Sequence, residues 1–405
     1  MRTYFIIATS IAFICIFFHT LISIVVVVAS FHPSSIVVQR GAQLHQQRQQ
    51  HSGLSPSAFD TDTTMTNIDD TKFHFAIDRG GTFTDIYCTL PNERGEIVTK
   101  LLSEDPSHYE DAPTEGIRRI LQQYDTTTTS TTGTTNPSLD YTRGHPVPTT
   151  NIGSIRMGTT VATNALLERN GSRMALLITS GFTDLLEIGN QSRPNIFDLK
   201  CTKPSLLYEC VVPIHERIVL KQYTPPQYSE LYEEHVGITG EVIQIIQPLD
   251  ILKVQESLEQ LRADGIKAIA ICCMHAYIYP QHELIIGQMA AAMNYFDYIA
   301  MSHQVMPMIK LVSRSHTTTA AAYLTPKIMN YLHSFIHGFD TNLLKNVALS
   351  FMKSDGGLTP HDNFGGHQAI LSGPAGGVVG YAKTAYHRSN RAHDESNEQP
   401  QPVIG

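Results

Sequence analysis

Apolar and polar positions follow one another along the chain in a way that predicts strands and helices in turn. Residues 73–77 and 83–90 alternate with the period of two that is typical of a strand, and a helix is predicted to begin near Pro113, a residue favoured in a first helical turn. The alternation of the two element types predicts an α/β fold. Further strands are predicted near Ile155 and at 174–179, 268–274 and 347–352, with helices at 249–261, 280–293 and 375–386.

The beginning of the chain has a different pattern. Residues 5–29 carry no charge, Arg2 precedes them, and as a helix they would span about 37 Å, enough to cross a bilayer. Residues 1–31 are therefore predicted to form an apolar leader. Three interpretations stay open: a signal anchor in the membrane, a signal peptide cleaved before Phe31, or an incorrectly assigned start of the gene. The first two imply membrane anchoring or import into the secretory pathway.

Two segments lack the apolar residues that a packed core requires. Residues 32–72 are rich in Gln, His, Ser, Thr and Asp, which predicts a disordered polar linker. Residues 126–135 are mostly threonine and are interpreted as an insertion in a surface loop, where extra length costs little.

Composition and charge narrow the class of protein. With 42% hydrophobic and 16% charged residues over 405 positions, the chain has the composition of a globular protein of two or three domains. A net charge of −8, without clustered Lys and Arg, excludes a nucleic-acid-binding protein. The six cysteines form no CxxC pair, so they are predicted to be reduced structural thiols.

The sharpest motif is Asp78-Arg-Gly-Gly-Thr-Phe-Thr-Asp85, placed between two predicted strands. Gly80 and Gly81 allow a tight turn whose N–H groups form a concavity for a phosphate, and the hydroxyls of Thr82 and Thr84 add donors. Asp78 and Asp85 would hold Mg²⁺, through waters, or orient a reacting water, which makes them the candidate catalytic residues. The alternative is an ordinary β-hairpin turn.

Two further polar segments are candidates for the same cleft. Thr159 or Thr160 is expected to cap a helix after Gly158, whose N-terminus either binds an anion or is simply capped. Arg193 is either a partner for a substrate carboxylate or a surface arginine.

Glycine-rich turns and a histidine-containing segment complete the set of candidates. The turn at Asp355 and the glycines Gly373, Gly376 and Gly377 either surround a ligand or allow close packing. The segment with His275, His282 and Glu283 is interpreted as capping or solvated residues rather than a metal site.

The motif at Asp78–Asp85 resembles the first phosphate loop of the actin, sugar-kinase and chaperone ATPase superfamily. More narrowly, the chain resembles the hydantoinase A/oxoprolinase family, in order, over residues 73–390. The blocks that carry the resemblance are 75–85, 100–106, 111–121, 155–169, 184–194, 323–326, 354–360 and 371–381.

The resemblance implies an actin/sugar-kinase-like ATPase fold with an N-terminal domain at 73–300 and the start of a second domain at 301–405. It implies ATP-dependent, Mg²⁺-assisted opening of the small cyclic amide 5-oxo-L-proline to L-glutamate, a reaction of the glutathione cycle. Nucleotide would contact the glycine and threonine candidates above, and Arg193 and Asp355 would contact substrate. A hydantoin-opening relative is the alternative. The family is cytosolic, and the resemblance implies a homodimer of the full-length protein.

The end of the sequence sets a further expectation. In the family, an apolar stretch like Val403-Ile404 leads into a second Asp-x-Gly-Gly-Thr loop, which does not appear here. The chain is therefore expected to be an incomplete and inactive part of the enzyme. The competing interpretation is a non-catalytic, truncated or membrane-tethered remnant.

Overall fold

The computed structural model describes residues 69–125, 140–190, 197, 198, 200 and 203–381. Every helix and strand described below belongs to one compact unit, residues 67–190 and 204–405. The apolar leader, the polar linker up to residue 68, the Thr-rich insertion and Arg193 lie outside the described residues. Within the part that is described, no helix is both long and apolar enough to span a bilayer.

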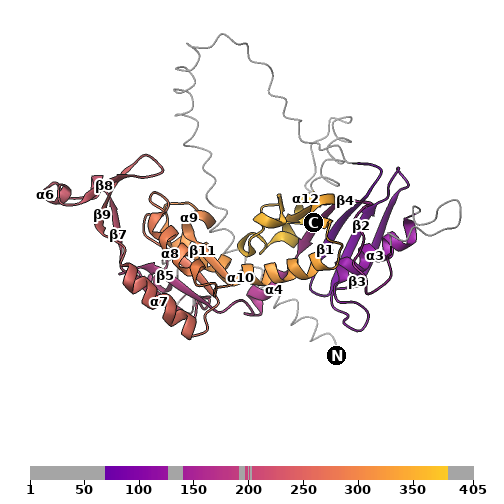
Figure 1. Cartoon of the computed structure of the whole chain (residues 1–405), viewed down its shortest axis with the longest axis horizontal. Coiled ribbons are helices and arrows are strands. Elements are labelled where there is room, and N and C mark those ends of the chain that lie inside the picture. The colour runs from indigo at the N-terminus through magenta and orange to yellow at the C-terminus, as the bar shows by residue number, and fades with distance from the viewer. Residues whose placement is uncertain (1–68, 126–139, 191–196, 199, 201–202, 382–405) are drawn as a thin grey trace, which may run out of the picture. The chain divides into compact units, whose positions relative to one another are not determined.

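The first sheet has six strands in the order β13-β12-β4-β1-β2-β3. Strands β1 to β4 of this sheet are labelled in Figure 1. Strands β1, β2 and β3 form an antiparallel meander, β4 lies parallel to β1, and β12 lies parallel to β4. Strands β12 and β13 thus join a sheet that begins at residue 73, although they follow residue 300; the domain boundaries stay a prediction. The strands are β1 (Phe73–Arg79), β2 (Phe83–Thr89), β3 (Glu96–Leu102), β4 (Ile152–Thr159), β12 (Ala348–Met352) and β13 (Leu358–Pro360).

One face of this sheet is packed and the other is open at β1–β3. In β2, buried Thr84, Ile86 and Cys88 alternate with exposed neighbours, as a half-buried strand requires. The packed face is covered by α3 (Ala112–Tyr124) and α10 (Leu311–His337). Asp111 begins α3 by accepting hydrogen bonds from Thr114 N at 2.9 Å and Thr114 Oγ1 at 2.6 Å.

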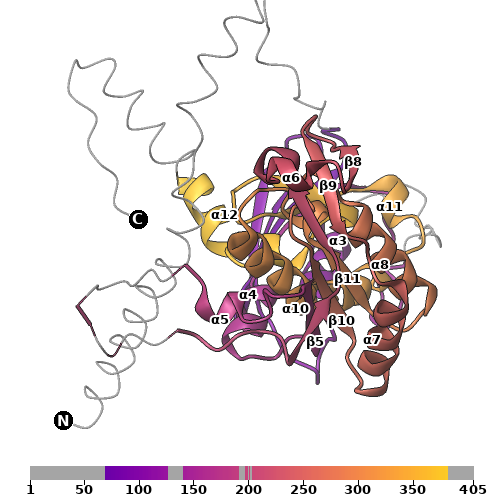
Figure 2. The same cartoon turned by 90° about the vertical axis from the view of Figure 1, so that its left-hand side faces the viewer.

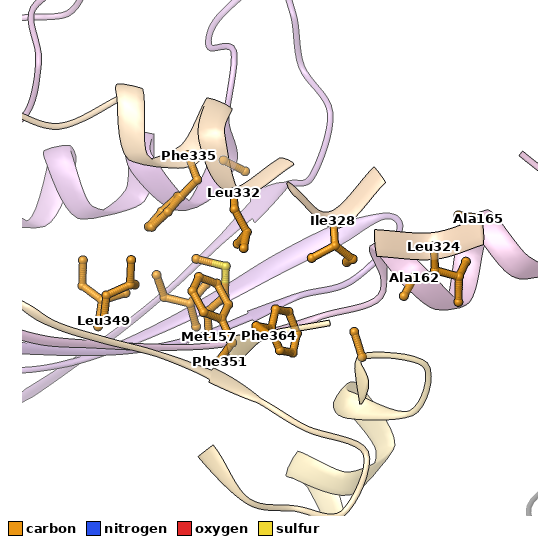
Figure 3. Close-up of a cluster of buried hydrophobic side chains, with 14 of the residues drawn as sticks. Met157, Ala162, Ala165, Leu324, Ile328, Leu332, Phe335, Leu349, Phe351 and Phe364 are labelled. Atoms are coloured by element: carbon orange, nitrogen blue, oxygen red, sulfur yellow. The ribbon is translucent and has the colours of Figure 1, made fainter. Parts of the chain in front are cut away.

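Figure 3 shows the apolar contact between α10 and the sheet. Its members include Leu332, Phe335, Met157, Leu349, Phe351 and Phe364.

The second sheet has four parallel strands in the order β11-β10-β5-β6. Helices α7 and α8 lie on one of its faces, while α10 packs on β10, β11 and β5 (Figure 2). Strands β5 and β10 are buried at every position, as is expected for a parallel sheet covered on both faces. The elements are β5 (Met174–Thr179), β6 (Cys210–Ile214), β10 (Ala268–Cys272), β11 (Tyr298–Met301), α7 (Ile251–Ala263) and α8 (Gln281–Ala292).

The remaining elements are short. A three-stranded antiparallel sheet has the order β7-β9-β8. Its strands are β7 (Arg217–Leu220), β8 (Glu233–Val236) and β9 (Val242–Gln247). The short helices are α4 (Val161–Leu167), α5 (Leu185–Ile188), α6 (Pro226–Ser229), α9 (Ser302–Val305), α11 (Leu343–Asn346) and α12 (Ser372–Tyr381), with 3₁₀ turns at Lys221–Tyr223, His361–Asn363 and Gly366–Gln368.

The α/β fold predicted from the sequence is confirmed, whereas helix α10 was not predicted. This helix has 27 residues and contains Pro326, which removes one backbone donor, and three consecutive β-branched threonines at 317–319. All three hydroxyls donate back to helix carbonyls: Thr317 Oγ1 to Ser313 O at 3.1 Å, Thr318 Oγ1 to Arg314 O at 2.7 Å and Thr319 Oγ1 to His316 O at 2.8 Å. Burial of α10, which is complete around the helix from residue 321 to residue 326, outweighs its weak intrinsic preference for helix.

The cysteines behave as predicted wherever they are described. Cys88, Cys272 and Cys273 are free and buried, and Cys210 is free and partly buried. Burial raises the pKa of the Cys88 and Cys272 thiols to about 12, so both are protonated at neutral pH.

Candidate functional site

A row of charged residues crosses the open face of the first sheet. Asp78, near the end of β1, stands opposite Asp85 on β2, and Asp85 stands opposite Lys100 on β3. Lys100 Nζ lies 2.8 Å from Asp85 Oδ1 and 3.0 Å from Oδ2, and both side chains are about half exposed. On the other side of Asp78 the partner is Gly158 of β4. The row therefore places two carboxylates and one ammonium side by side.

The two carboxylates are electrostatically unequal. Like charges directly opposite in a sheet repel, and among the residues that the structure describes only Asp85 of the two is paired with a lysine. Desolvation, followed by the nearby Asp85 charge, raises the pKa of Asp78, while Lys100 partly opposes this. An added cation at Asp78 would relieve the repulsion, so the pair suits a metal ion.

Hydrogen bonds to its backbone hold the glycine turn between β1 and β2 in place. Gly80 N donates to Phe83 O at 3.0 Å, and Ser103 binds the turn twice, through its N to Thr82 O at 2.8 Å and through its Oγ to Gly80 O at 2.7 Å. Within the described chain, the N–H groups of Gly81 and Thr82 have no hydrogen-bond acceptor. These two free donors lie beside Asp78, in an arrangement that suits an anion such as a phosphate.

The two glycines tolerate a side chain to different degrees. A Cβ at Gly80 would lie 2.8 Å from the backbone oxygen of Phe83, so the turn itself would have to shift. A Cβ at Gly81 would meet only the side-chain Nδ2 of Asn164, at 3.2 Å. Gly80 is therefore required by the turn, and Gly81 keeps the space above it open.

Thr84 occupies a different place from its neighbours in the motif. It is fully buried on the opposite face from Asp85, and its hydroxyl shares a hydrogen bond with Ser103 Oγ at 3.0 Å. Thr84 thus supports Ser103, which in turn holds the glycine turn. The period of two along β2 was the signal that separates Thr84 from Asp85, and Ser103 was present in the block at 100–106 without a role.

The end of β4 is tied to the turn and to α12. Thr160 N donates to Arg79 O at 3.1 Å, and Ser372 Oγ donates to Thr159 O at 2.7 Å. Thr160 stands at the N-cap position of α4 but makes no side-chain capping bond, whereas Thr159 Oγ1 accepts from Val161 N at 3.3 Å. The polar contacts of Gly158–Thr160 therefore join the first turn to the start of α12.

The candidate glycines of α12 differ in the space around their Cβ positions. A Cβ at Gly373 would lie 3.5 Å from the Thr160 methyl group, and one at Gly376 would lie 3.8 Å from Met352. Gly377 has open space around its Cβ position. Gly373 is thus beside the cleft residues of β4, and Gly376 packs on β12.

Asp355 lies in the turn between β12 and β13. Its carboxylate accepts from Gly357 N at 2.8 Å and pairs with Lys353 Nζ at 2.8 Å, and these contacts lower its pKa. The neighbouring Ser354 Oγ accepts from Leu371 N at 3.0 Å, which ties this turn to the start of α12. The structure therefore brings the loops at 78–85, 158–160, 354–357 and 370–373 together through hydrogen bonds, whereas Arg193 lies outside the described residues.

A second polar cluster is buried at the carboxyl ends of the parallel strands. Glu283 accepts from Cys273 N at 2.8 Å, from Ser302 Oγ at 2.5 Å and from His303 Nδ1 at 2.6 Å. Glu216, also fully buried, pairs with His282 Nδ1 at 2.9 Å. The interpretation of His282 and Glu283 as capping or solvated residues was wrong, because each binds a partner from a distant segment. No group of three metal-binding side chains occurs among the described residues.

Comparison with known proteins identifies the family to which this architecture belongs. Residues 74–294 match the hydantoinase/oxoprolinase N-terminal region, and residues 314–393 match the hydantoinase/oxoprolinase family. The chain is 48% identical over 323 residues to 5-oxoprolinase 1 of Arabidopsis thaliana, covering 80% of the chain and 24% of that protein. It is 46% identical over 343 residues to the 5-oxoprolinase of Dictyostelium discoideum, covering 82% of the chain and 26% of that protein. The chain thus spans about a quarter of the length of these curated relatives.

Solved structures support the fold. The ATP-dependent caprolactamase of Pseudomonas jessenii aligns with a TM-score of 0.55 at 22% identity, over 76% of this chain and 40% of that one. A nucleotide-free acetone carboxylase aligns with a TM-score of 0.55 at 17% identity, over 79% and 41%. At these identities the likeness concerns the fold. With matches that run from residue 74 to residue 393, the chain belongs to the hydantoinase/oxoprolinase family.

Proposed function

We propose that the chain supplies a nucleotide-binding lobe for ATP-dependent hydrolysis of 5-oxo-L-proline to L-glutamate. The observation that carries the proposal is the turn at Gly80–Thr82, with two free N–H donors beside a pair of carboxylates. Relatives at 46–48% identity are named 5-oxoprolinases, which favours this cyclic amide over a hydantoin.

The chemistry explains why a phosphate loop is needed. A five-membered lactam is a poor electrophile, and transfer of the γ-phosphoryl group to its carbonyl oxygen activates the ring carbon. Water then adds to that carbon, the C–N bond breaks with its electron pair and a proton going to nitrogen, and the resulting acyl phosphate is hydrolysed. Preorganised donors that stabilise the phosphoryl oxygens are the main contribution of the protein to such a transfer.

The residues present fit a nucleotide with Mg²⁺. Gly81 N and Thr82 N would hold phosphate oxygens, and Asp78 and Asp85 would hold Mg²⁺ through waters. Mg²⁺ would neutralise phosphate charge when bound. Thr84 acts indirectly in this proposal, through Ser103. Gly158, Thr159, Thr160 and Gly373 would line the cleft, with Gly376 and Gly377 in the helix behind it.

The candidate substrate residues and the assembly stay predictions. Asp355 is engaged by Lys353, so it would reach substrate only by exchanging that partner. The role of Arg193 and the homodimer rest on the family resemblance.

The direct test is ATP binding, measured by calorimetry in the presence of Mg²⁺. Gly81→Val should weaken binding at least tenfold while the circular dichroism spectrum stays unchanged, because only the flexible Asn164 side chain must move. Gly380→Val is the matched control, since its Cβ position is open, and it should bind as the parent does. Equal ATP affinity in a folded Gly81→Val protein would refute the loop assignment.

The substrate is tested separately. ATP turnover is measured in a full-length enzyme that contains this chain. It should be stimulated by 5-oxo-L-proline, with release of glutamate, and much less by hydantoin. Stimulation by hydantoin alone would support the alternative within the family.

A further inference from the structure

A pocket lies at the carboxyl edge of the four-stranded parallel sheet. The chain moves from β5 outward to β6, then returns to β10 and continues to β11 on the other side. The order therefore reverses between β5 and β10, and open α/β sheets bind ligands at the carboxyl ends of strands next to such a point. Ser180 directly follows β5, Arg217 lies three residues after the end of β6, and His275 lies three residues after the end of β10.

The pocket has the size and lining of a small-molecule site. Its volume is about 340 Å³, near the lower end of the range for ligand pockets. Arg217 and His275 provide polar groups, Ile218 and Met274 provide apolar surface, and Tyr223 and Tyr228 provide aromatic rings. None of these residues belongs to the glycine turn or to the loops tied to it.

Three polar groups that line this pocket have donors or acceptors to spare. Arg217 Nη2 donates to Ser180 O at 2.6 Å and its guanidinium lies 4.9 Å from the Phe182 ring centre, so its orientation is fixed. In the described part of the chain, the other Arg217 nitrogens and the His275 ring have no hydrogen-bond partner. The hydroxyl of Thr224 is buried and also lacks a partner there. A buried hydroxyl without a partner is costly, and a ligand would relieve that cost.

His275 is held in an unusual backbone conformation. Its φ of 59° lies in the left-handed region, which is uncommon for a residue other than glycine. The preceding residues are pinned by buried side chains: Cys273 O accepts from Arg314 Nη2 at 2.6 Å, and Met274 N donates to Thr179 Oγ1 at 2.8 Å. Backbone conformations of this kind persist when the surroundings impose them, and they cluster at functional sites.

The surroundings of His275 favour its neutral form. Burial, and next the positive charge of Arg314, lower its pKa, and Arg217 acts in the same direction, while Glu216 opposes them. A neutral imidazole offers one donor and one acceptor, so it can bind a ring N–H or carbonyl, while Arg217 remains the cation that can bind a carboxylate.

We propose that this pocket binds a small organic carboxylate with a planar ring. Arg217 binds the carboxylate through its free N–H groups, His275 and Thr224 bind a polar atom of the ring, and the tyrosines contact the ring faces. The proposal is independent of ATP use, because it shares no residue with the phosphate loop.

Calorimetric titration with pyrrole-2-carboxylate tests the site, and the neutral pyrrole-2-carboxamide is the matched probe. The carboxylate should bind at least tenfold more tightly than the carboxamide. Arg217→Met should reduce carboxylate binding at least tenfold, whereas Arg262→Met, an exposed arginine on α7, should not change it. Failure of the parent chain to bind pyrrole-2-carboxylate, or unchanged binding by Arg217→Met, would overturn the proposal.

His275→Gly separates a binding role from a structural one. Glycine accepts a positive φ without strain, so the variant should keep or exceed the parent melting temperature while binding the carboxylate at least fivefold more weakly. A large fall in melting temperature with unchanged binding would show that His275 only supports the fold, which contradicts its assigned role.

Discussion

The two sheets present their charges in opposite ways. At the glycine turn of the first sheet, Asp85 and Lys100 are about half exposed and Asp78 is also exposed. At the carboxyl edge of the second sheet, Glu216, Glu283 and Arg314 are fully buried, and each is hydrogen-bonded to groups from distant segments. Exposed charges stay available for a ligand and contribute little to stability, whereas buried ones must be satisfied internally. The first arrangement is therefore the one that the proposed nucleotide site requires, and the second holds the loop that carries His275.

The largest expected effect is at Arg314. Arg314→Met would leave Cys273 O, Met308 O and Ser302 Oγ without their donor and would leave Glu283 with less compensation. The free energy of unfolding, measured by urea denaturation, should fall by about 3–5 kcal/mol. Arg262→Met is the control and should cost less than about 1 kcal/mol. If both variants lost the same small amount of unfolding free energy, the buried charges would stabilise the fold no more than an exposed one does.

A smaller effect is expected at Ser103, because it supports the glycine turn from within the sheet. Ser103→Ala removes the hydrogen bonds to Gly80 O and Thr84 Oγ1 and should cost about 1–2 kcal/mol in unfolding free energy. ATP affinity should fall with it, since the free N–H groups lose their fixed direction. Ser103→Thr keeps the hydroxyl and should restore most of the affinity; if alanine bound ATP as tightly as serine, Ser103 would have no positioning role.

The smallest expected effect is a gain in stability at Asp78. Its pKa is raised in the folded protein, so the stability contributed by its protonated form is present below the ordinary value of 3.8 and is lost as pH rises through the raised value. Asp78→Asn should therefore be more stable than the parent at pH 7, by less than about 1 kcal/mol, and equally stable at acidic pH. Thermal unfolding across pH measures this. A variant that is less stable than the parent at pH 7 would show that the Asp78 charge stabilises the fold.

The same substitution should abolish any dependence of ATP binding on Mg²⁺. A gain in stability together with a loss of metal-dependent binding would show that repulsion between Asp78 and Asp85 is retained for function. Lys100→Met offers the converse test: it removes the cation that pairs with Asp85, so it should lower stability by up to about 1 kcal/mol.

Much of the first region was predictable because its residues are close in sequence. The motif from Asp78 to Asp85 lies within one strand–turn–strand segment, so spacing alone indicates a glycine turn flanked by carboxylates. The role assigned to Thr84 as a phosphate donor did not take account of strand alternation, and the support from Ser103 depends on how β3 returns beside β2. The predicted strand–turn–strand segment is therefore present, and its role as a phosphate loop stays a prediction.

The second region was not predictable in this way. Glu216, Glu283 and Arg314 are separated by tens of residues, and nothing in their local sequence says that they meet. His282 and Glu283 begin a helix, where solvated or capping residues are the usual expectation, yet they bind Glu216 and His303 inside the protein. Helix α10, which supplies Arg314, was itself missed because Pro326 and the threonines argue against a helix.

The sequence by itself determined the α/β class, the position of the glycine turn and the family, because local periodicity and contiguous motifs are written along the chain. The tertiary structure decided which charges face solvent and which are buried, how Ser103 and Ser372 tie separate loops together, and where His275 lies. These features depend on contacts between segments far apart in the chain. Such contacts are selected by packing and by the need to satisfy every buried polar group, and those requirements exist only once the sheets and α10 have assembled.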